Sequence, residues 1–197
     1  MRGASLAPPA STLQTMRLLA SLAALFVLAS CGGGGGETAG GAADLPGPVP
    51  AGVEFVAPPG SALAAPDFSA ELIDGTPVRA SDLWRDRPVV LVFTASYCDR
   101  CAEIHRRAAE AVGAHDGAIA LLGVVGEDDV DGGRDYADEL ELGHPVAVAS
   151  ERVWLDYAAR EPGLVVLVAR GGKVLRGWPG GATVAELRPR LEELIAR

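Results

Sequence analysis

The stretch RPVVLVFTASYCDRC, Arg87 to Cys101, decides the fold class of this sequence. It begins with a continuous apolar run, Pro88 to Ala95, which is typical of a β-strand buried on both faces. Two cysteines, Cys98 and Cys101, follow the run, and apolar residues then recur at helical spacing. The stretch therefore predicts a buried strand, a turn that carries a CxxC motif, and a helix.

The residues on either side continue this alternation of strands and helices. We expect strands at 118–126, 145–149, 164–170 and 173–178, and helices at 134–142, 151–160 and 183–197. An entry hairpin turns at Asp74-Gly75, and the last two strands join at Gly171-Gly172. Parallel crossovers early and antiparallel pairing late predict an α/β fold, with a central mixed β-sheet flanked by helices on both faces.

The length and net charge of the chain limit its number of domains and its class of partner. The chain has 197 residues, which is room for one ordinary domain plus extra segments. Its net charge is −9, and removal of residues 1–30 takes away two arginines and no acid, which leaves −11. A body this acidic argues against nucleic acid as a partner.

The N-terminus has the features of a bacterial lipoprotein signal peptide. Arg17 supplies the positive charge, and the apolar run Leu18 to Leu28 has 11 residues, too few to span a bilayer comfortably. The next residues, Ala29-Ser30-Cys31, complete a stretch that resembles a lipobox, whose cysteine is acylated and becomes the new N-terminus. The alternatives are an uncleaved anchor or an ordinary secretory signal, and translation could start at Met1 or at Met16.

Three regions are therefore expected. Residues 1–30 are the signal peptide, residues 31–65 are the lipid-attachment cysteine with a flexible Gly/Ala/Pro tether, and residues 66–197 are the folded domain. The tether is too poor in apolar residues to fold. This organisation predicts an extracytoplasmic protein that a lipid on Cys31 anchors to the cell membrane.

The CxxC pair admits three chemical interpretations: a metal site, a structural staple or a redox couple. A zinc site needs four ligands, or three and a water, and no second CxxC exists to complete one. A staple across four residues removes little entropy from the unfolded chain. Redox chemistry needs neither a metal nor another cofactor, and it is the interpretation that the position of the pair favours.

Cys98 is expected where a buried strand ends and a helix begins. Unpaired backbone N–H groups and the positive end of the helix dipole favour thiolate there, so Cys98 would act as the nucleophile. Cys101, one helical turn later, would resolve the mixed disulfide. Asp99 and Arg100, between the two cysteines, are expected to tune the couple.

Several further stretches give the chain a family resemblance. They are Pro66-Asp67-Phe68, LIDGTPVRASDL (72–83), RPVVLVFTASYCDRC (87–101), LLGVVGED (121–128) and YAAREPGLVVLVARGGKVL (157–175). In this set the chain resembles thioredoxin-like thiol–disulfide oxidoreductases of the membrane-anchored TlpA type, which include cytochrome-c-biogenesis thioredoxins.

The resemblance implies a thioredoxin fold in which Cys98 is exposed and Cys101 is more buried. It implies that Pro162 is the family's cis-proline, preceded by Glu161, and that it faces the disulfide and presents backbone to the substrate. Tyr97 replaces the tryptophan that usually precedes the first cysteine, and it would shield the disulfide and contact the substrate.

The chain lacks the acids that assist the second cysteine in many relatives. Val92 and Ile104 stand where a carboxylate is often found, and Glu103 lies one residue early. His105, four residues after Cys101, is a candidate acceptor for its proton. The alternative is a partly exposed helix histidine with no role.

The predicted function is a membrane-tethered thiol–disulfide oxidoreductase. It would exchange disulfides with extracytoplasmic proteins through Cys98 and Cys101, supplied by a membrane electron donor or acceptor. Two alternatives stay open. One is a peroxiredoxin-like peroxidase, although that family places threonine three residues before its reactive cysteine and Thr94 lies four before Cys98. The other is a copper-binding module that uses both cysteines and a histidine.

Overall fold

The computed structural model describes residues 39–115, 117–126 and 129–196. By its contacts the chain divides into two units, Met1–Gly36 and Glu37–Arg197, and the described residues all belong to the second unit. The predicted signal peptide and the predicted acylated Cys31 lie outside the described residues.

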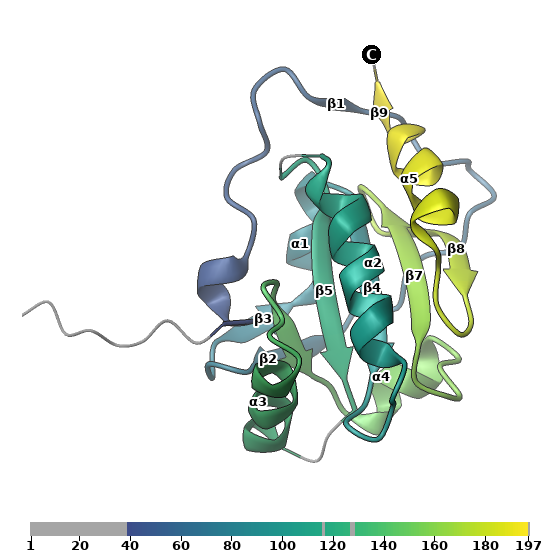
Figure 1. Cartoon of the computed structure of the whole chain (residues 1–197). Helices are drawn as coiled ribbons and strands as arrows, with labels where there is room; N and C mark the ends of the chain where they lie inside the picture. The colour runs from purple at the N-terminus through teal and green to yellow at the C-terminus, as the bar shows by residue number, and fades with distance from the viewer. Residues whose placement is uncertain (1–38, 116, 127–128, 197) are drawn as a thin grey trace, which may run out of the picture. The chain divides into compact units, whose positions relative to one another are not determined.

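The second unit alternates strands and helices along the chain (Figure 1). Its strands are β1 (Glu54–Phe55), β2 (Ser69–Leu72), β3 (Pro77–Arg79), β4 (Val89–Thr94), β5 (Ala120–Val125), β6 (Val146–Val148), β7 (Leu164–Ala169), β8 (Lys173–Trp178) and β9 (Ile195–Ala196). Its helices are the short η1 (Ala42–Asp44), then α1 (Ala80–Asp86), α2 (Cys101–Gly113), α3 (Val130–Glu139), α4 (Glu151–Asp156) and α5 (Val184–Glu192). Each predicted strand and helix has a counterpart, with ends that differ by a few residues. The helix predicted over 183–197 is too long, because α5 ends at Glu192 and residues 195–196 pair as β9 with β1.

Seven strands form one mixed sheet in the order β3-β2-β6-β5-β4-β7-β8. β4 pairs in parallel with β5, and β5 with β6, whereas β7 is antiparallel to both β4 and β8. The predicted fold class, parallel early and antiparallel late, is confirmed.

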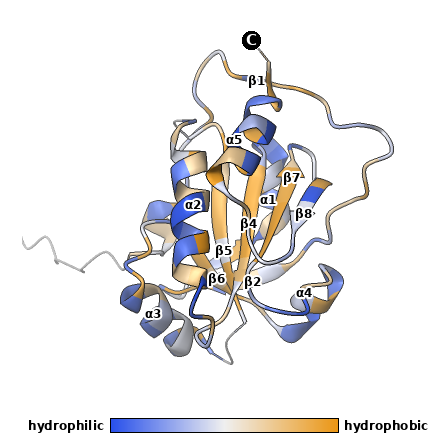
Figure 2. Ribbon diagram, turned by 45° about the vertical axis from the view of Figure 1, so that its right-hand side comes forward, coloured by the Kyte–Doolittle hydropathy of each residue, from blue (hydrophilic) through white to orange (hydrophobic). Residues whose placement is uncertain are grey.

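Two hydrophobic clusters cover the two faces of the sheet. Along β4, Val90 and Val92 belong to the cluster that contains α2, α3 and α5, while Leu91 and Phe93 belong to the cluster that contains α1 and α4. All six residues of β4 are buried, because both faces of the strand carry helices. Figure 2 shows the central strands as the most hydrophobic part of the ribbon.

The segments that form the site lie at one end of the central strands. The parallel strands β4, β5 and β6 all have their carboxyl ends there. β7 begins there, because it runs antiparallel to β4 and pairs Leu164 with Phe93. The backbone N–H of Gly163 donates to the Phe93 carbonyl over 2.7 Å. The loop before β7 is therefore held beside the turn that leaves β4.

The segment from Ala39 to Ala65 lies against the domain, which corrects the prediction of a flexible tether through Ala65. Val146 N–H donates to Gly40 O over 2.7 Å, and the buried Arg87 donates to Gly47 O over 2.5 Å. Further along, β1 pairs with β9. Ala42, Leu45 and Ala65 also pack against a core cluster. These contacts are with residues distant in the sequence, which the composition of the segment does not reveal.

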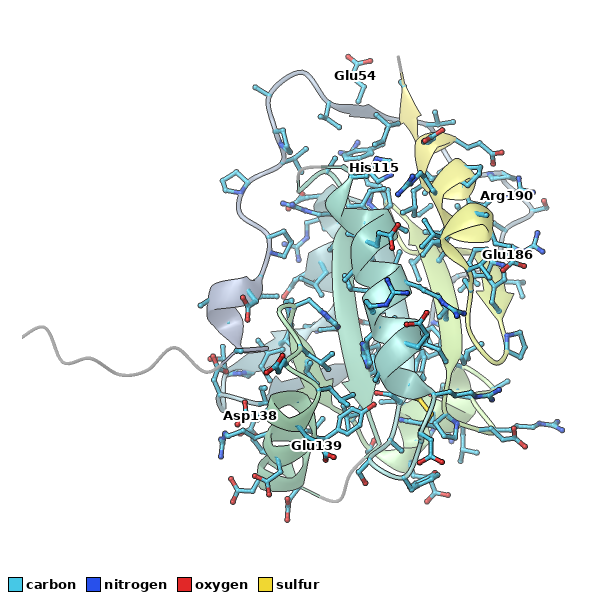
Figure 3. The ribbon with its side chains drawn as sticks, viewed as in Figure 1. Glu54, His115, Asp138, Glu139, Glu186 and Arg190 are labelled. Atoms are coloured by element: carbon cyan, nitrogen blue, oxygen red, sulfur yellow. A yellow bond between two sulfur atoms is a disulfide. The ribbon has the colours of Figure 1, made fainter. Side chains whose placement is uncertain are left out.

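The last helix begins with the capping box expected from the spacing of Thr183 and Glu186. The Thr183 hydroxyl accepts from the Glu186 N–H over 3.2 Å, and the Glu186 carboxylate accepts from the Thr183 N–H over 2.9 Å. Figure 3 labels Glu186 at this end of α5. Leu187 and Leu191 then place α5 in the same cluster as α2.

Loss of this cap should destabilise the fold measurably. Thr183→Ala removes the hydroxyl that satisfies a backbone donor, so the free energy of unfolding should fall by about 1 kcal/mol in urea denaturation. Thr183→Ser keeps the hydroxyl and is the matched control. Equal stability of the alanine and serine variants would contradict the prediction.

Candidate redox site

The turn between β4 and α2 carries both cysteines. Cys98 N–H donates to Ala95 O, and Cys101 N–H donates to Cys98 O, each over 3.0 Å. α2 begins at Cys101 with Arg100 as its N-cap residue, so Cys98 lies in the turn before the helix and not within its first turn. Its sulfur is nevertheless linked to the first helical residue, at the positive end of the helix dipole.

Cys98 and Cys101 form a disulfide, with 5.4 Å between their Cα atoms (the yellow bond in Figure 3). The two sulfurs have different environments, because Cys98 is half-buried and Cys101 is fully buried at 0% exposure. An incoming thiolate can therefore approach Cys98, while Cys101 is protected. This difference agrees with what the family resemblance implies.

An open pocket of about 430 Å³ lies over Cys98. Its lining residues are Tyr97, Cys98, Asp99, Arg100, Glu161 and Pro162. The structure thus brings together two segments that are 60 residues apart in the sequence, and every one of these residues was predicted to belong to the site. The substrate-contacting role of Tyr97, Glu161 and Pro162 remains a prediction.

The prediction of a cis bond before Pro162 is wrong, because the structure has no cis peptide among its described residues. The trans form is the lower in free energy for most X–Pro bonds. The chain turns instead at Gly163, whose φ is +101°, a region that glycine adopts readily. Pro162 still reaches the pocket over Cys98, as expected.

Ile104 closes the site from behind. It is 3% exposed, and a Cβ atom built on Gly163 or Gly181 would lie 2.9 Å from its side chain. The two loops therefore pack directly on Ile104 through their glycines. This explains why an apolar residue is tolerated where related proteins often carry an acid: a carboxylate here would be buried without a partner.

Gly163→Ala is expected to damage both the fold and the pocket. The new methyl would meet Ile104 at 2.9 Å, at a φ that residues with a side chain rarely adopt. The free energy of unfolding should fall by at least ~1 kcal/mol, measured by urea denaturation. Gly143→Ala, a surface glycine with open space at its Cβ, is the control. A Gly163→Ala protein as stable as this control would contradict the expectation.

A second pocket, of about 470 Å³, continues from the first across Tyr97. Its other lining residues are Gly126, Ala149, Glu151, Trp154, Leu155, Ala159 and Arg160. Tyr97 is 75% exposed and Leu155 is 65% exposed, so apolar surface extends from the disulfide onto α4. This extension was not predicted from the sequence, although α4 follows β6 and so starts at the carboxyl end of the parallel strands.

His105 is completely buried, so its interpretation as a partly exposed histidine is wrong. Its Nδ1 lies 2.9 Å from His144 Nε2, and its Nε2 lies 3.1 Å from the Thr94 hydroxyl. Gly123 leaves room for the His105 ring, because a Cβ atom at this position would lie only 3.2 Å from the ring. Both ring nitrogens are thus occupied by partners other than Cys101.

Burial keeps both histidines neutral. Loss of solvation, with a smaller effect of His144, lowers the pKa of His105 to about 3. Loss of solvation lowers the pKa of His144 to about 4, opposed by the charge of Asp44. Glu103, two residues after Cys101, has its pKa lowered to about 2 by hydrogen bonds from Arg106 and then Arg107. None of these three groups is a ready base near neutral pH.

Two kinds of feature are absent from the described residues. No group of three or more His, Cys, Asp or Glu side chains in residues 39–115, 117–126 and 129–196 is placed to hold a metal ion. No helix in these ranges is long and apolar enough to cross a membrane.

Several solved structures with a similar fold are named as thiol–disulfide proteins. One is the thioredoxin domain of a thiol-disulfide oxidoreductase from Bacteroides vulgatus, with a TM-score of 0.60 and 16% identity, covering 69% of this chain and 98% of that chain. A secreted disulfide oxidoreductase of Mycobacterium tuberculosis has a TM-score of 0.53 and 19% identity, covering 64% and 94%. The exposed lipoprotein thioredoxin of Streptococcus pneumoniae has a TM-score of 0.56 and 26% identity, covering 66% and 100%.

These similarities confirm the predicted thioredoxin-like fold, and the prediction of an oxidoreductase enzyme agrees with them. No curated protein matches the sequence. The model of the AhpC/TSA family matches residues 62–171, more than half of the chain and the whole stretch from before β2 to the end of β7. The chain belongs to the AhpC/TSA family.

Proposed function

We propose that this protein is a membrane-tethered, extracytoplasmic thiol–disulfide oxidoreductase that acts on protein substrates through Cys98 and Cys101. One observation carries the proposal: the Cys98–Cys101 disulfide has one sulfur at an open pocket and the other fully buried. Exchange with another protein needs this difference, because one sulfur must be attacked while the other is kept for resolution.

In the reducing direction, the Cys98 thiolate attacks one sulfur of a substrate disulfide. The Cys98–substrate bond forms, and the second substrate sulfur leaves as a thiolate and takes up a proton. Cys101 then loses its proton and attacks Cys98, which forms the Cys98–Cys101 disulfide and releases the first substrate sulfur. The couple gives up two electrons, and the substrate disulfide becomes two thiols.

The location is proposed from the N-terminal sequence. A lipid on Cys31 would hold the domain at the outer face of the cytoplasmic membrane, and the similar pneumococcal structure is that of an exposed lipoprotein. Palmitate labelling of the expressed chain tests this. We expect label on the wild type and none on Cys31→Ala, which should be released from membranes. A labelled Cys31→Ala protein would contradict the anchor.

The partners are proposed from the TlpA-type resemblance. Extracytoplasmic cysteine pairs, such as those of an apocytochrome c, are the expected substrates, and a membrane electron carrier is the expected redox supply. The apolar surface from Tyr97 to Leu155 suits an unfolded chain, which presents apolar side chains next to its cysteines.

The reduction potential of the Cys98–Cys101 couple tests the activity and gives its direction. The protein is equilibrated in glutathione buffers with different ratios of reduced to oxidised glutathione, and its free thiols are then labelled. The reduced fraction of the couple should follow a single two-electron transition. A potential near about −270 mV indicates a reductant, and one near −120 mV indicates an oxidant. A disulfide that exchanges with neither glutathione nor a protein disulfide would overturn the proposal.

A second candidate is a thiol peroxidase, because the AhpC/TSA family match is compatible with one. Thr94 is four residues before Cys98, and its buried hydroxyl lies 3.1 Å from His105 Nε2. Peroxide consumption by the reduced protein separates the candidates. We expect slow consumption and fast exchange with a protein disulfide, and fast, saturable peroxide consumption would favour the peroxidase.

A further inference from the structure

Proton removal from Cys101 is a step that the carboxylates near the site do not explain. Val92 and Ile104 are apolar and buried, and Glu103 is engaged by two arginines. Yet Cys101 is fully buried, so bulk water does not reach its thiol directly. The polar groups buried beside it are the natural place to look for the acceptor.

A continuous chain of hydrogen-bonding groups runs from the end of β4 to His105, which follows Cys101 on the same face of α2. Thr94 Oγ1 is 3.1 Å from His105 Nε2, and His105 Nδ1 is 2.9 Å from His144 Nε2. His105 follows Cys101 by one helical turn, a spacing that puts two Cβ atoms about 5–6 Å apart. Thr94 ends β4 on the face that carries Val92, which shares a cluster with Cys101.

The geometry points to a proton relay: we propose that Thr94, His105 and His144 carry the proton of Cys101 away from the buried sulfur during resolution. The proposal rests on the proposed function. It explains why two imidazoles and a hydroxyl are buried in contact, at a cost in solvation, next to the resolving cysteine.

The relay works without a charged histidine. Each neutral imidazole has one N–H and one bare nitrogen, so it can accept a proton at one nitrogen while it gives one up at the other. A proton that leaves Cys101 Sγ goes to Thr94 Oγ1, the hydroxyl proton goes to His105 Nε2, and the His105 Nδ1 proton goes to His144 Nε2. His144 releases its Nδ1 proton to water, and the Cys101 thiolate attacks Cys98, which forms the Cys98–Cys101 bond and displaces the substrate sulfur as a thiolate. The low pKa values of the two histidines are compatible with this route.

The far end of the relay lies near the docked N-terminal segment, because a Cβ atom on Gly40 would lie 3.5 Å from the His144 carbonyl oxygen. Asp44 of η1 is half-buried, and its charge acts on His144. Tyr136 of α3 is a further titratable neighbour, with its ring centroid 6.4 Å from that of His105. The last group of the relay is thus near residues that precede the family match.

The test separates resolution from attack. Cys98 is loaded with a chromogenic thiol as a mixed disulfide, and its release by Cys101 is followed by stopped flow from pH 5.5 to 9. Thr94→Val and His144→Asn should slow release at pH 7 by roughly tenfold or more, with partial recovery at high pH. Thr94→Ser should retain the wild-type rate. Wild-type release and pH profiles in folded Thr94→Val and His144→Asn proteins would overturn the relay.

Two controls keep the result specific. Val146 packs beside Gly123 and Gly40 but carries no group that can transfer a proton. Val146→Ala should therefore lower the free energy of unfolding and leave the pH profile of release unchanged. In a Cys101→Ser background, Thr94→Val should leave the rate of attack by Cys98 unchanged. If the wild type never forms or releases the mixed disulfide, the proposed function fails, whereas normal release in the variants makes only the relay fail.

A wild-type measurement covers the case in which the variants do not fold. Release in mixtures of H₂O and D₂O should slow by about twofold or more in pure D₂O, with a curved dependence on the deuterium fraction, because several protons move together. A linear dependence, or no isotope effect, would overturn the relay.

Discussion

Cys98→Ser should reduce disulfide exchange by at least ~10³-fold, because it removes the only accessible sulfur of the couple. Cys101→Ser should behave differently. Its Cys98 can still attack, but nothing resolves the product, so the protein should accumulate as a mixed disulfide with its substrate. Turnover with a reduced protein substrate or insulin measures the first effect, and non-reducing electrophoresis with mass spectrometry measures the second.

The third cysteine offers a matched control for these variants. Cys31→Ser removes a thiol far from the couple in sequence, so exchange by the purified protein should stay at the wild-type rate. If Cys98→Ser retained turnover, or if Cys101→Ser trapped no partner, the assignment of attacking and resolving cysteines would be wrong.

The buried histidine pair should make the fold sensitive to mild acid. Both pKa values are lowered in the folded state, to about 3 for His105 and about 4 for His144, so the unfolded chain binds more protons below its ordinary histidine pKa of about 6.5. Stability is therefore fully present above pH 6.5 and is lost as pH falls towards 4. Between pH 6.5 and 4.5 the free energy of unfolding should fall by about 4 kcal/mol for the pair.

Urea denaturation at several pH values measures this slope. Carboxylates, with ordinary pKa values of about 4, begin to protonate near the acid end of this range, so histidine variants are needed to isolate the effect of the pair. The double variant His105→Gln/His144→Gln should show a flatter dependence, whatever its absolute stability. His115→Gln, which replaces a half-buried histidine outside the pair, should change the slope much less. A wild-type stability that is constant from pH 6.5 to 4.5 would show that the pair is not buried in its neutral form.

The core of the fold could be predicted because each signal was local. The continuous apolar run of β4 reflects burial on both faces, and the CxxC motif with Pro162 marked the two segments that meet at the pocket. These features depend on strand periodicity and on the way parallel strands end at one edge. Neither requires knowledge of distant contacts.

The remaining features depended on contacts that a linear pattern does not encode. His105 was recognised by its spacing from Cys101, but its burial depends on Gly123 and on His144, 39 residues away. The bond before Pro162 was expected to be cis from the family resemblance alone, and no residue pattern in the chain bears on the isomer. The packing of residues 39–65 depends on contacts with residues distant in the sequence, which composition does not report.

The docked N-terminal segment leaves the approach to the disulfide open. Gly40 bonds to Val146, the first residue of β6, whereas Cys98 lies beyond the end where the parallel strands finish. The residues that line the pocket over Cys98 come from the turn before α2 and the loop before β7, and none of them belongs to the described segment 39–65. A partner protein can therefore reach Cys98 without displacing this segment, and the hydrogen bonds that hold it can persist through the whole exchange reaction.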